Sequence, residues 1–246
     1  MAVKTIIVEK DNRKLTGEIT LPASKSISNR LMIIHALCGG DFMIRNLSRS
    51  DDTWLMIKAL EMIRYPRRDG KVQEIDVNNA GTVLRFLTAY LSIQPGKWMV
   101  TGSDRMKQRP VGILADALNT LGASIDYLGK PGYPPLLISG RQLTGDTVSV
   151  NPGVSSQFVS ALLLIAPYLK NGLKIILHGK WVSTPYVTMT IRLMEQCGAR
   201  IKTGSRTIRV YPGKYNPPLM TVEADWSAAA FWYEAAALAD EVNITL

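Results

Sequence analysis

The stretch ASKSISNR at residues 23–30, followed by a largely apolar run, is the part of the sequence around which the rest is organised. A strand-like segment, Leu15–Leu21, leads into it. Serines of this kind cap helices, so we expect a helix to begin near Ser26. The free N–H groups and positive dipole end of that helix would lie beside Lys25 and Arg30, a combination that favours an anion. A serine cap beside two solvated cations would produce the same pattern, so this stretch alone leaves both interpretations open.

Composition indicates an ordinary globular chain with an anionic partner. The 246 residues are 46% apolar and 20% charged, enough for one large core or two modest domains. A formal charge of +9 favours nucleic acid, a membrane surface, or a small phosphorylated or carboxylated substrate. The longest apolar run, Phe158–Leu169, is too short to span a bilayer, and the N-terminus does not resemble a signal peptide. Because Cys38 and Cys197 cannot form a disulfide framework, we expect a cytoplasmic protein without membrane contact.

One pattern recurs along the chain: small polar residues followed by a helix that is apolar on nearly every side. The predicted helices of this type are Ser26–Leu37, Ala80–Ser92, Ser155–Leu169 and Asp225–Ala239. Such helices belong inside a core. Amphipathic helices that begin at a polar or proline cap alternate with them: Asp52–Ile63, Arg109–Leu121 and Thr184–Cys197.

Short strands separate these helices. They are predicted at Trp98–Thr101, Ser124–Leu128, Leu136–Ser139, Thr147–Val150, Lys174–His178, Arg200–Lys202 and Thr207–Tyr211. Each unit is thus βαβαββ, and we predict three complete units. Apolar helices between strands imply an inside-out α/β domain, with helices buried and sheets outside. Because the last apolar helix has no amphipathic partner before Leu246, we expect the chain to be a fragment.

If rotation relates the units, their helix starts meet at one end of the domain in a polar site. The residues expected there are Lys25, Ser26 and Arg30 from the first unit, Asn79, Gly81, Thr82 and Arg109 from the second, and Ser155, Ser156, Gln157, Ser183 and Tyr186 from the third. Such a site suits an anion that carries phosphate and carboxylate groups. Gly81 would let the backbone approach a ligand closely, although a tight helix entry is the simpler explanation of this glycine alone. Simple capping likewise explains each serine alone.

Other chemistry finds little support. His35 lies within an apolar helix and is interpreted as a core histidine, and His178 has no paired Asp or Cys. Asp51 and Asp52 stand at a helix start and are interpreted as structural. The sequence contains no Walker loop, GxGxxG after a strand, HExxH or CxxC, so we predict no cofactor and no metal.

Several motifs in register resemble the 5-enolpyruvylshikimate-3-phosphate (EPSP) synthase family. They are KSISNR at 25–30, SDDT at 50–53, NAGT at 79–82, RMKQRP at 105–110, YPPL at 133–136, SSQ at 155–157 and STPY at 183–186. The resemblance runs from about residue 15 to residue 240. It implies the enolpyruvyl transferase fold, two inside-out α/β domains that close on substrate, and transfer of the enolpyruvyl group of phosphoenolpyruvate to the 5-hydroxyl of shikimate 3-phosphate.

The resemblance also implies roles for the predicted site residues. For shikimate 3-phosphate these are Ser26 and Arg30 at the carboxylate side, Ser155, Ser156 and Ser183 at the 3-phosphate, Tyr186 in the same pocket, and Gln157 between the two substrates. For phosphoenolpyruvate they are Lys25, Gly81 and Arg109, with Gly81 deciding glyphosate sensitivity. Lys25 and Arg109 would act in catalysis by stabilising developing charge. The proton-transfer carboxylates of the family have no counterpart in this chain.

By resemblance, the domain crossovers fall near residues 20 and 225–228. Residues 21–224 would then form one complete substrate-binding domain. Residues 1–20 and 225–246 would belong to a second, mostly missing C-terminal domain. We expect the fragment to bind shikimate 3-phosphate and to be inactive alone.

Two other functions remain as alternatives. UDP-N-acetylglucosamine enolpyruvyl transferase shares the fold but works through a cysteine on a mobile loop, whereas Cys38 and Cys197 are predicted in helical segments. A nucleic-acid-binding module built on the same repeat would interleave aromatic and basic residues on an exposed face. Most aromatic residues fall in apolar helices instead, which argues against nucleic acid as a partner.

Overall fold

A computed structural model describes residues 7, 12–40, 42–66, 71–151, 153, 155–179 and 184–246. The helices are α1 (Lys25–Leu37), α2 (Asp51–Arg64), α3 (Gly81–Ser92), α4 (Gly112–Thr120), α5 (Ser156–Ile165), α6 (Thr184–Gln196) and α7 (Trp226–Leu238), with 3₁₀ turns η1 (Met106–Gln108) and η2 (Ala166–Tyr168). The strands are β1 (Lys14–Glu18), β2 (Ile44–Arg45), β3 (Gln73–Asp76), β4 (Gly96–Thr101), β5 (Ile125–Tyr127), β6 (Leu136–Gly140), β7 (Thr147–Val150), β8 (Leu173–Leu177), β9 (Ile201–Thr203), β10 (Thr207–Val210), β11 (Met220–Thr221) and β12 (Glu241–Thr245).

Two four-stranded sheets have the same topology, which confirms the repeat. Their orders are β3-β4-β6-β5 and β7-β8-β10-β9. In each sheet the first pair is parallel and the other two pairs are antiparallel. The second and third units are therefore complete βαβαββ modules.

The first unit differs from the prediction of three complete modules. Within the described residues, α2 is followed next by β3, which belongs to the second unit's sheet. The place of a closing hairpin is taken by residues 220–224, because β11 pairs in parallel with β2 and Ala224 forms a bridge with Ala23. The first unit is therefore completed by residues 220–224, which lie far along the chain. In the other two units the corresponding strands come from a hairpin within the unit.

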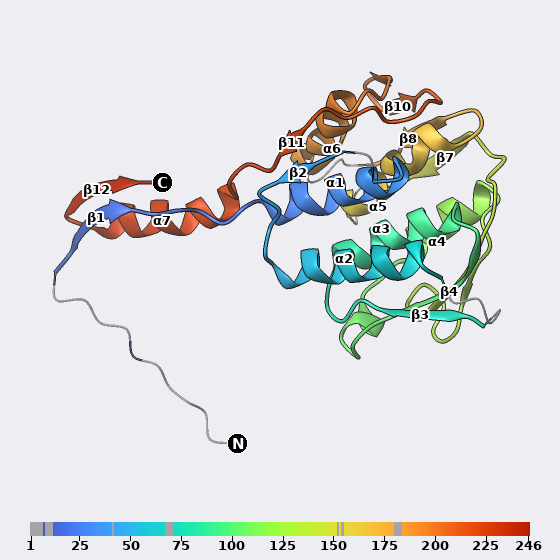
Figure 1. Ribbon diagram of the computed structural model, residues 1–246, viewed down its shortest axis with the longest axis horizontal. Coiled ribbons are helices and arrows are strands. Elements are labelled where there is room, and N and C mark those ends of the chain that lie inside the picture. Colours follow the sequence, from blue (N-terminus) through green and yellow to red (C-terminus); the bar gives the residue numbers. More distant parts are fainter. Residues whose placement is uncertain are drawn as a thin grey trace.

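The apolar helices form the interior, as the sequence predicts. In α3 every residue from Val83 to Ser92 is buried, and α5 is buried from Phe158 to Ile165. These two helices pack on each other, and α1 contacts both of them. Figure 1 shows the sheets and the amphipathic helices around this centre.

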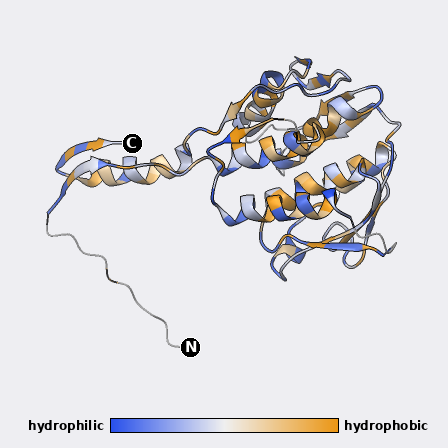
Figure 2. Ribbon diagram, viewed as in Figure 1, coloured by the Kyte–Doolittle hydropathy of each residue, from blue (hydrophilic) through white to orange (hydrophobic). Residues whose placement is uncertain are grey.

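Helix α7 is the exception among the apolar helices, because it is not buried. It projects from the main body together with β1 and β12, which pair in parallel (Figure 1). Ala229 is its one buried residue, while Trp226, Phe231, Tyr233 and Leu238 are exposed. Figure 2 shows these hydrophobic turns outside the core. Within the described residues, one side of this helix is thus partly covered, and the side with these four side chains is open.

Smaller differences from the sequence prediction lie at element boundaries. Helix α4 begins at Gly112, after an extended Arg109, so Pro110 does not open the helix as predicted. Strands β2, β3 and β11 were not predicted, because none of them shows a long apolar alternation. None of the helices in the described ranges is long and apolar enough to cross a membrane.

We expect Leu162→Ala in α5 to lower the free energy of unfolding by about 3 kcal/mol, because Leu162 is completely buried between the central helices. Leu238→Ala is the matched control, since this side chain on α7 is 64% exposed, and should change stability by less than about 0.5 kcal/mol. Urea denaturation followed by circular dichroism measures both. Equal losses in the two variants would contradict the assignment of the core.

Candidate functional site

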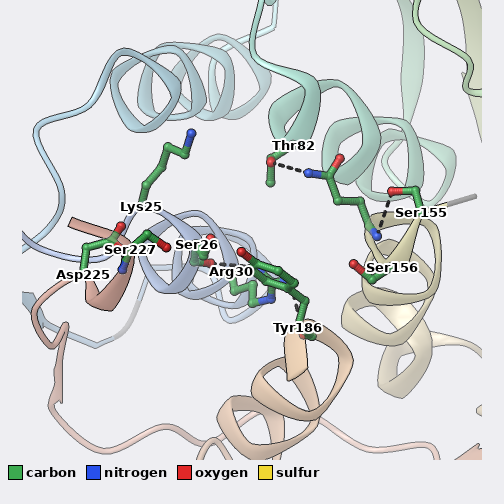
Figure 3. A pocket seen from close by; sticks show the side chains of 10 residues that line it. Lys25, Ser26, Arg30, Thr82, Ser155, Ser156, Tyr186, Asp225 and Ser227 are labelled. Carbon is green, nitrogen blue, oxygen red and sulfur yellow. Dashed lines mark hydrogen bonds between the residues drawn. The ribbon is translucent and has the colours of Figure 1, made fainter. Parts of the chain in front are cut away.

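A cavity of about 490 Å³ lies where the N-terminal ends of α1, α3, α5 and α6 meet the start of α7 (Figure 3). Its lining is almost entirely polar: Lys25, Ser26, Arg30, Thr82, Ser155, Ser156, Gln157, Tyr186, Asp225 and Ser227. Most of the predicted site residues are therefore brought together. Gly81 and Arg109 are not among the lining residues, and Ser183 lies outside the described residues.

Serine caps fix two of the helix ends at this cavity. The Ser24 hydroxyl accepts a hydrogen bond from the Ile27 backbone N–H (3.4 Å) at the start of α1. The Ser155 hydroxyl accepts one from the Gln157 N–H (3.2 Å) at the start of α5. The Gln157 amide then donates to the Thr82 hydroxyl of α3 at 3.0 Å, so α3 and α5 are joined across the cavity wall.

Arg30 is a buried cation at the base of the cavity. Its side chain is 2% exposed, and no carboxylate forms an ion pair with it in the described part of the chain. Its guanidinium also lies over the ring of Phe86, 5.3 Å from the centroid. Burial lowers the pKa of Arg30 to about 10, so the group still carries its charge near neutral pH. An uncompensated buried cation favours an anion in the adjoining cavity.

Lys25 is held on the opposite side of the cavity. Its ammonium lies 3.7 Å from a carboxylate oxygen of Asp52 in α2, and Figure 3 shows the side chain extending away from Arg30. Asp52 lies at the start of α2 and also forms an ion pair with Lys25, a predicted site residue. The lysine is 44% exposed, so this pair contributes little stability and leaves the ammonium accessible.

Gly81 and Arg109 lie against each other next to the cavity. The Arg109 guanidinium donates to the Asn79 carbonyl at 3.2 Å. A Cβ built on Gly81 would be 2.5 Å from Cζ of Arg109 and 2.6 Å from Nη2. Glycine thus allows the Arg109 guanidinium to lie directly against the backbone here, and a larger residue would displace that side chain.

A second buried arginine, Arg85, hydrogen-bonds to the backbone on both sides of the contact between Gly81 and Arg109. Arg85, 4% exposed, donates to the Gly81 carbonyl at 2.8 Å and to the Pro110 carbonyl at 3.0 Å. Burial, and to a smaller extent the charge of Arg109, lower the pKa of Arg85 to about 10. Arg85 therefore fixes both backbone segments that carry Gly81 and Arg109. The sequence pattern gave no indication of this role.

Asp225 and Ser227 line the cavity but are absent from the predicted set. Asp225 caps α7 by accepting from the Ser227 N–H at 2.9 Å. The sequence shows that Asp225 can cap a helix. Because Asp225 lies 195 positions after Arg30 in the sequence, no local pattern indicates that the two lie at the same cavity. Asp225 is also the one carboxylate of the lining.

Other candidate groups lie away from the cavity. His35 packs against Phe42 with ring centroids 5.2 Å apart. Cys38 and Cys197 are not lining residues, and burial raises the pKa of the Cys197 thiol to about 12, so it is not a reactive thiolate. In the described ranges no cluster of His, Cys, Asp and Glu is placed to hold a metal ion.

The chain matches known proteins along nearly its whole length. The family model "EPSP synthase (3-phosphoshikimate 1-carboxyvinyltransferase)" matches residues 9–246. The chain is 50% identical over 234 residues to a 3-phosphoshikimate 1-carboxyvinyltransferase of Bacteroides fragilis, covering 95% of this chain and 55% of the relative. For that of a Sulfurovum species the identity is 37% over 253 residues, covering 94% and 59%.

Solved structures agree in fold. EPSP synthase from Acinetobacter baumannii superposes with a TM-score of 0.80 at 24% identity, over 95% of this chain and 55% of that one. The chain thus spans little more than half the length of the relatives it matches. Because the family model spans nearly the whole sequence, the chain belongs to the EPSP synthase (3-phosphoshikimate 1-carboxyvinyltransferase) family.

Proposed function

We propose that this chain is the shikimate 3-phosphate-binding half of an enzyme that transfers the enolpyruvyl group of phosphoenolpyruvate to the 5-hydroxyl of shikimate 3-phosphate. The observation that carries the proposal is Arg30, a buried cation without an acidic partner in the described chain, at the base of a cavity ringed by hydroxyls and helix N-termini. A ligand with a carboxylate at one end and a phosphate at the other suits this arrangement.

Each end of the ligand has its own set of residues in this proposal. Arg30 and Ser26 bind the carboxylate side of the ring. Ser155 and Ser156, at the N-terminus of α5, take the 3-phosphate together with Ser183. Tyr186 lines the phosphate pocket, and Gln157 lies between the two substrates. Phosphoenolpyruvate binds beside Lys25, Gly81 and Arg109, where the two cations stabilise charge that develops during addition and elimination.

The reaction also needs a proton delivered to the methylene carbon of phosphoenolpyruvate and one removed from the attacking hydroxyl. We propose that the carboxylates for these steps come from a C-terminal domain. Residues 21–224 form the substrate-binding domain in this view, and β1, α7 and β12 belong to the other one. The exposed apolar side chains of α7 support this division, because such a surface is normally covered.

The cytoplasm is the proposed compartment, supported by two cysteines that are not joined in a disulfide. A UDP-N-acetylglucosamine enolpyruvyl transferase is less well supported, because the described lining of the cavity contains no cysteine.

We expect Ser156→Ala to weaken the binding of shikimate 3-phosphate about tenfold, because a hydrogen bond to a charged phosphate is lost. Isothermal titration calorimetry on the 246-residue chain measures the change. Ser92→Ala is the matched control. Ser92 is also buried in a central helix, where it donates to the Thr88 carbonyl at 2.7 Å outside the cavity, and its removal should leave the affinity unchanged. Unchanged affinity in Ser156→Ala would remove the phosphate assignment.

We expect the chain alone to release no measurable phosphate from the two substrates, because loss of a proton-transfer group costs roughly 10²-fold or more in rate. A phosphate-release assay, with the full-length Bacteroides fragilis relative as positive control, tests this. Turnover by the chain at a rate near that of the control would overturn the proposed division of labour between the domains.

A further inference from the structure

We infer that Thr190 of α6 and Ser160 of α5 are positioning residues, which hold the Arg30 guanidinium in the orientation needed to bind the substrate carboxylate. This inference rests on the proposed function of the cavity. Both side chains are fully buried, and neither lines the cavity. They therefore act on a ligand only through Arg30.

Five hydrogen bonds connect this cluster. The Arg30 Nε–H donates to Thr190 Oγ1 at 2.6 Å, and Nη2 donates to Ser160 Oγ at 3.2 Å and to the Tyr186 carbonyl at 3.4 Å. Thr190 Oγ1 lies 2.8 Å from the Tyr186 carbonyl and 2.9 Å from Ser160 Oγ. Residues of α1, α5 and α6 are thereby joined through one guanidinium.

One arrangement of the hydroxyl protons satisfies all of these contacts together. A carbonyl can only accept, so the Thr190 hydroxyl proton goes to the Tyr186 carbonyl. Thr190 must then accept from Ser160, whose proton points to it. Both hydroxyl oxygens keep lone pairs for the Arg30 N–H groups. In this arrangement Thr190 Oγ1 donates once, to the Tyr186 carbonyl, and accepts twice, from Arg30 and from Ser160.

The network also limits what Arg30 can offer a ligand. The Nε and Nη2 edge, which arginine can use for a bidentate carboxylate contact, is occupied by the two hydroxyls and the Tyr186 carbonyl. Nη1 donates one proton to the Ser26 carbonyl at 2.8 Å. The remaining N–H of Nη1 has no partner in the described residues, and Ser26 beside it lines the cavity. Arg30 therefore binds the anion through its charge and one directed N–H.

Thr190→Val tests the inference, because valine keeps the shape of threonine but leaves the Arg30 Nε–H and the Ser160 hydroxyl without an acceptor. We expect calorimetry to show shikimate 3-phosphate binding weakened about tenfold or more. Thr190→Ser keeps the hydroxyl and should restore affinity to within about threefold of the wild type.

Thr88→Val in α3 is the matched control. Thr88 is equally buried and makes the same kind of bond to the carbonyl four residues earlier, at 2.7 Å to Leu84, but it is not among the hydrogen-bond partners of Arg30 in the described residues. It should lose thermal stability without losing affinity. Equal affinity in Thr190→Val and wild type would overturn the inference, and so would an equal loss in Thr88→Val or Thr190→Ser.

A measurement without ligand separates this inference from the proposed function. In ¹⁵N NMR spectra, the Arg30 Nε–H signal is assigned by its absence in Arg30→Lys. It should keep its chemical shift in Thr190→Ser and Thr88→Val, and should shift or disappear through solvent exchange in Thr190→Val. If the wild type fails to bind shikimate 3-phosphate while this pattern holds, the proposed substrate is wrong and the positioning role stands. An unchanged Arg30 signal in Thr190→Val contradicts the positioning role, whatever the binding result.

Discussion

The arrangement of this molecule depends on keeping a guanidinium charged inside a core of apolar helices. Moving a cation out of water is unfavourable, and this desolvation is the reason that the pKa of Arg30 is lowered. Hydroxyl and carbonyl oxygens satisfy most of its N–H groups, but none of them neutralises the charge. A positive charge without a carboxylate partner in the described residues therefore lies at the end of the helix bundle, and an anion bound in the cavity would offset it.

The repeat explains why there are two such cations. Ser26, Gly81 and Ser156 all lie in the first turns of their helices, α1, α3 and α5. Four residues later, about one helical turn, come Arg30, Arg85 and Ser160. Arg30 and Arg85 both reach back to the carbonyl four residues earlier at 2.8 Å, and each lies over a phenylalanine ring of the next unit. In the third unit the equivalent position carries Ser160, which accepts from Arg30. The same position of the repeat thus carries a buried cation that lines the cavity, an arginine that bonds to the Gly81 and Pro110 carbonyls, and a serine that accepts a hydrogen bond.

The sequence was sufficient for the parts of this design that depend on periodicity. Helices α1, α3 and α5 could be predicted because they are apolar on nearly every side. The polar residues at their starts could be predicted because such residues cap helices. Contacts between segments that are far apart in the sequence could not be predicted from local patterns. Nothing local in residues 220–224 indicates that they complete the first unit, and the contact between Gly81 and Arg109 depends on a loop whose path is set by Arg85. Local pattern therefore specified the repeat, while tertiary packing specified which repeat residues meet.

The paired crossing of the chain has a mechanical consequence. Two antiparallel segments connect the projecting β1–α7–β12 element to the main body, tied by bonds from Ser24 to Glu223 at 2.9 Å and from Asp225 to Pro22 at 2.8 Å. One segment runs directly into the helix that carries Arg30, and the other contributes Asp225 to the cavity wall. A two-stranded tether of this kind resists twisting more than a single strand would. Any swing of the projecting element would therefore also move Asp225 and Ser227 in the wall of the cavity.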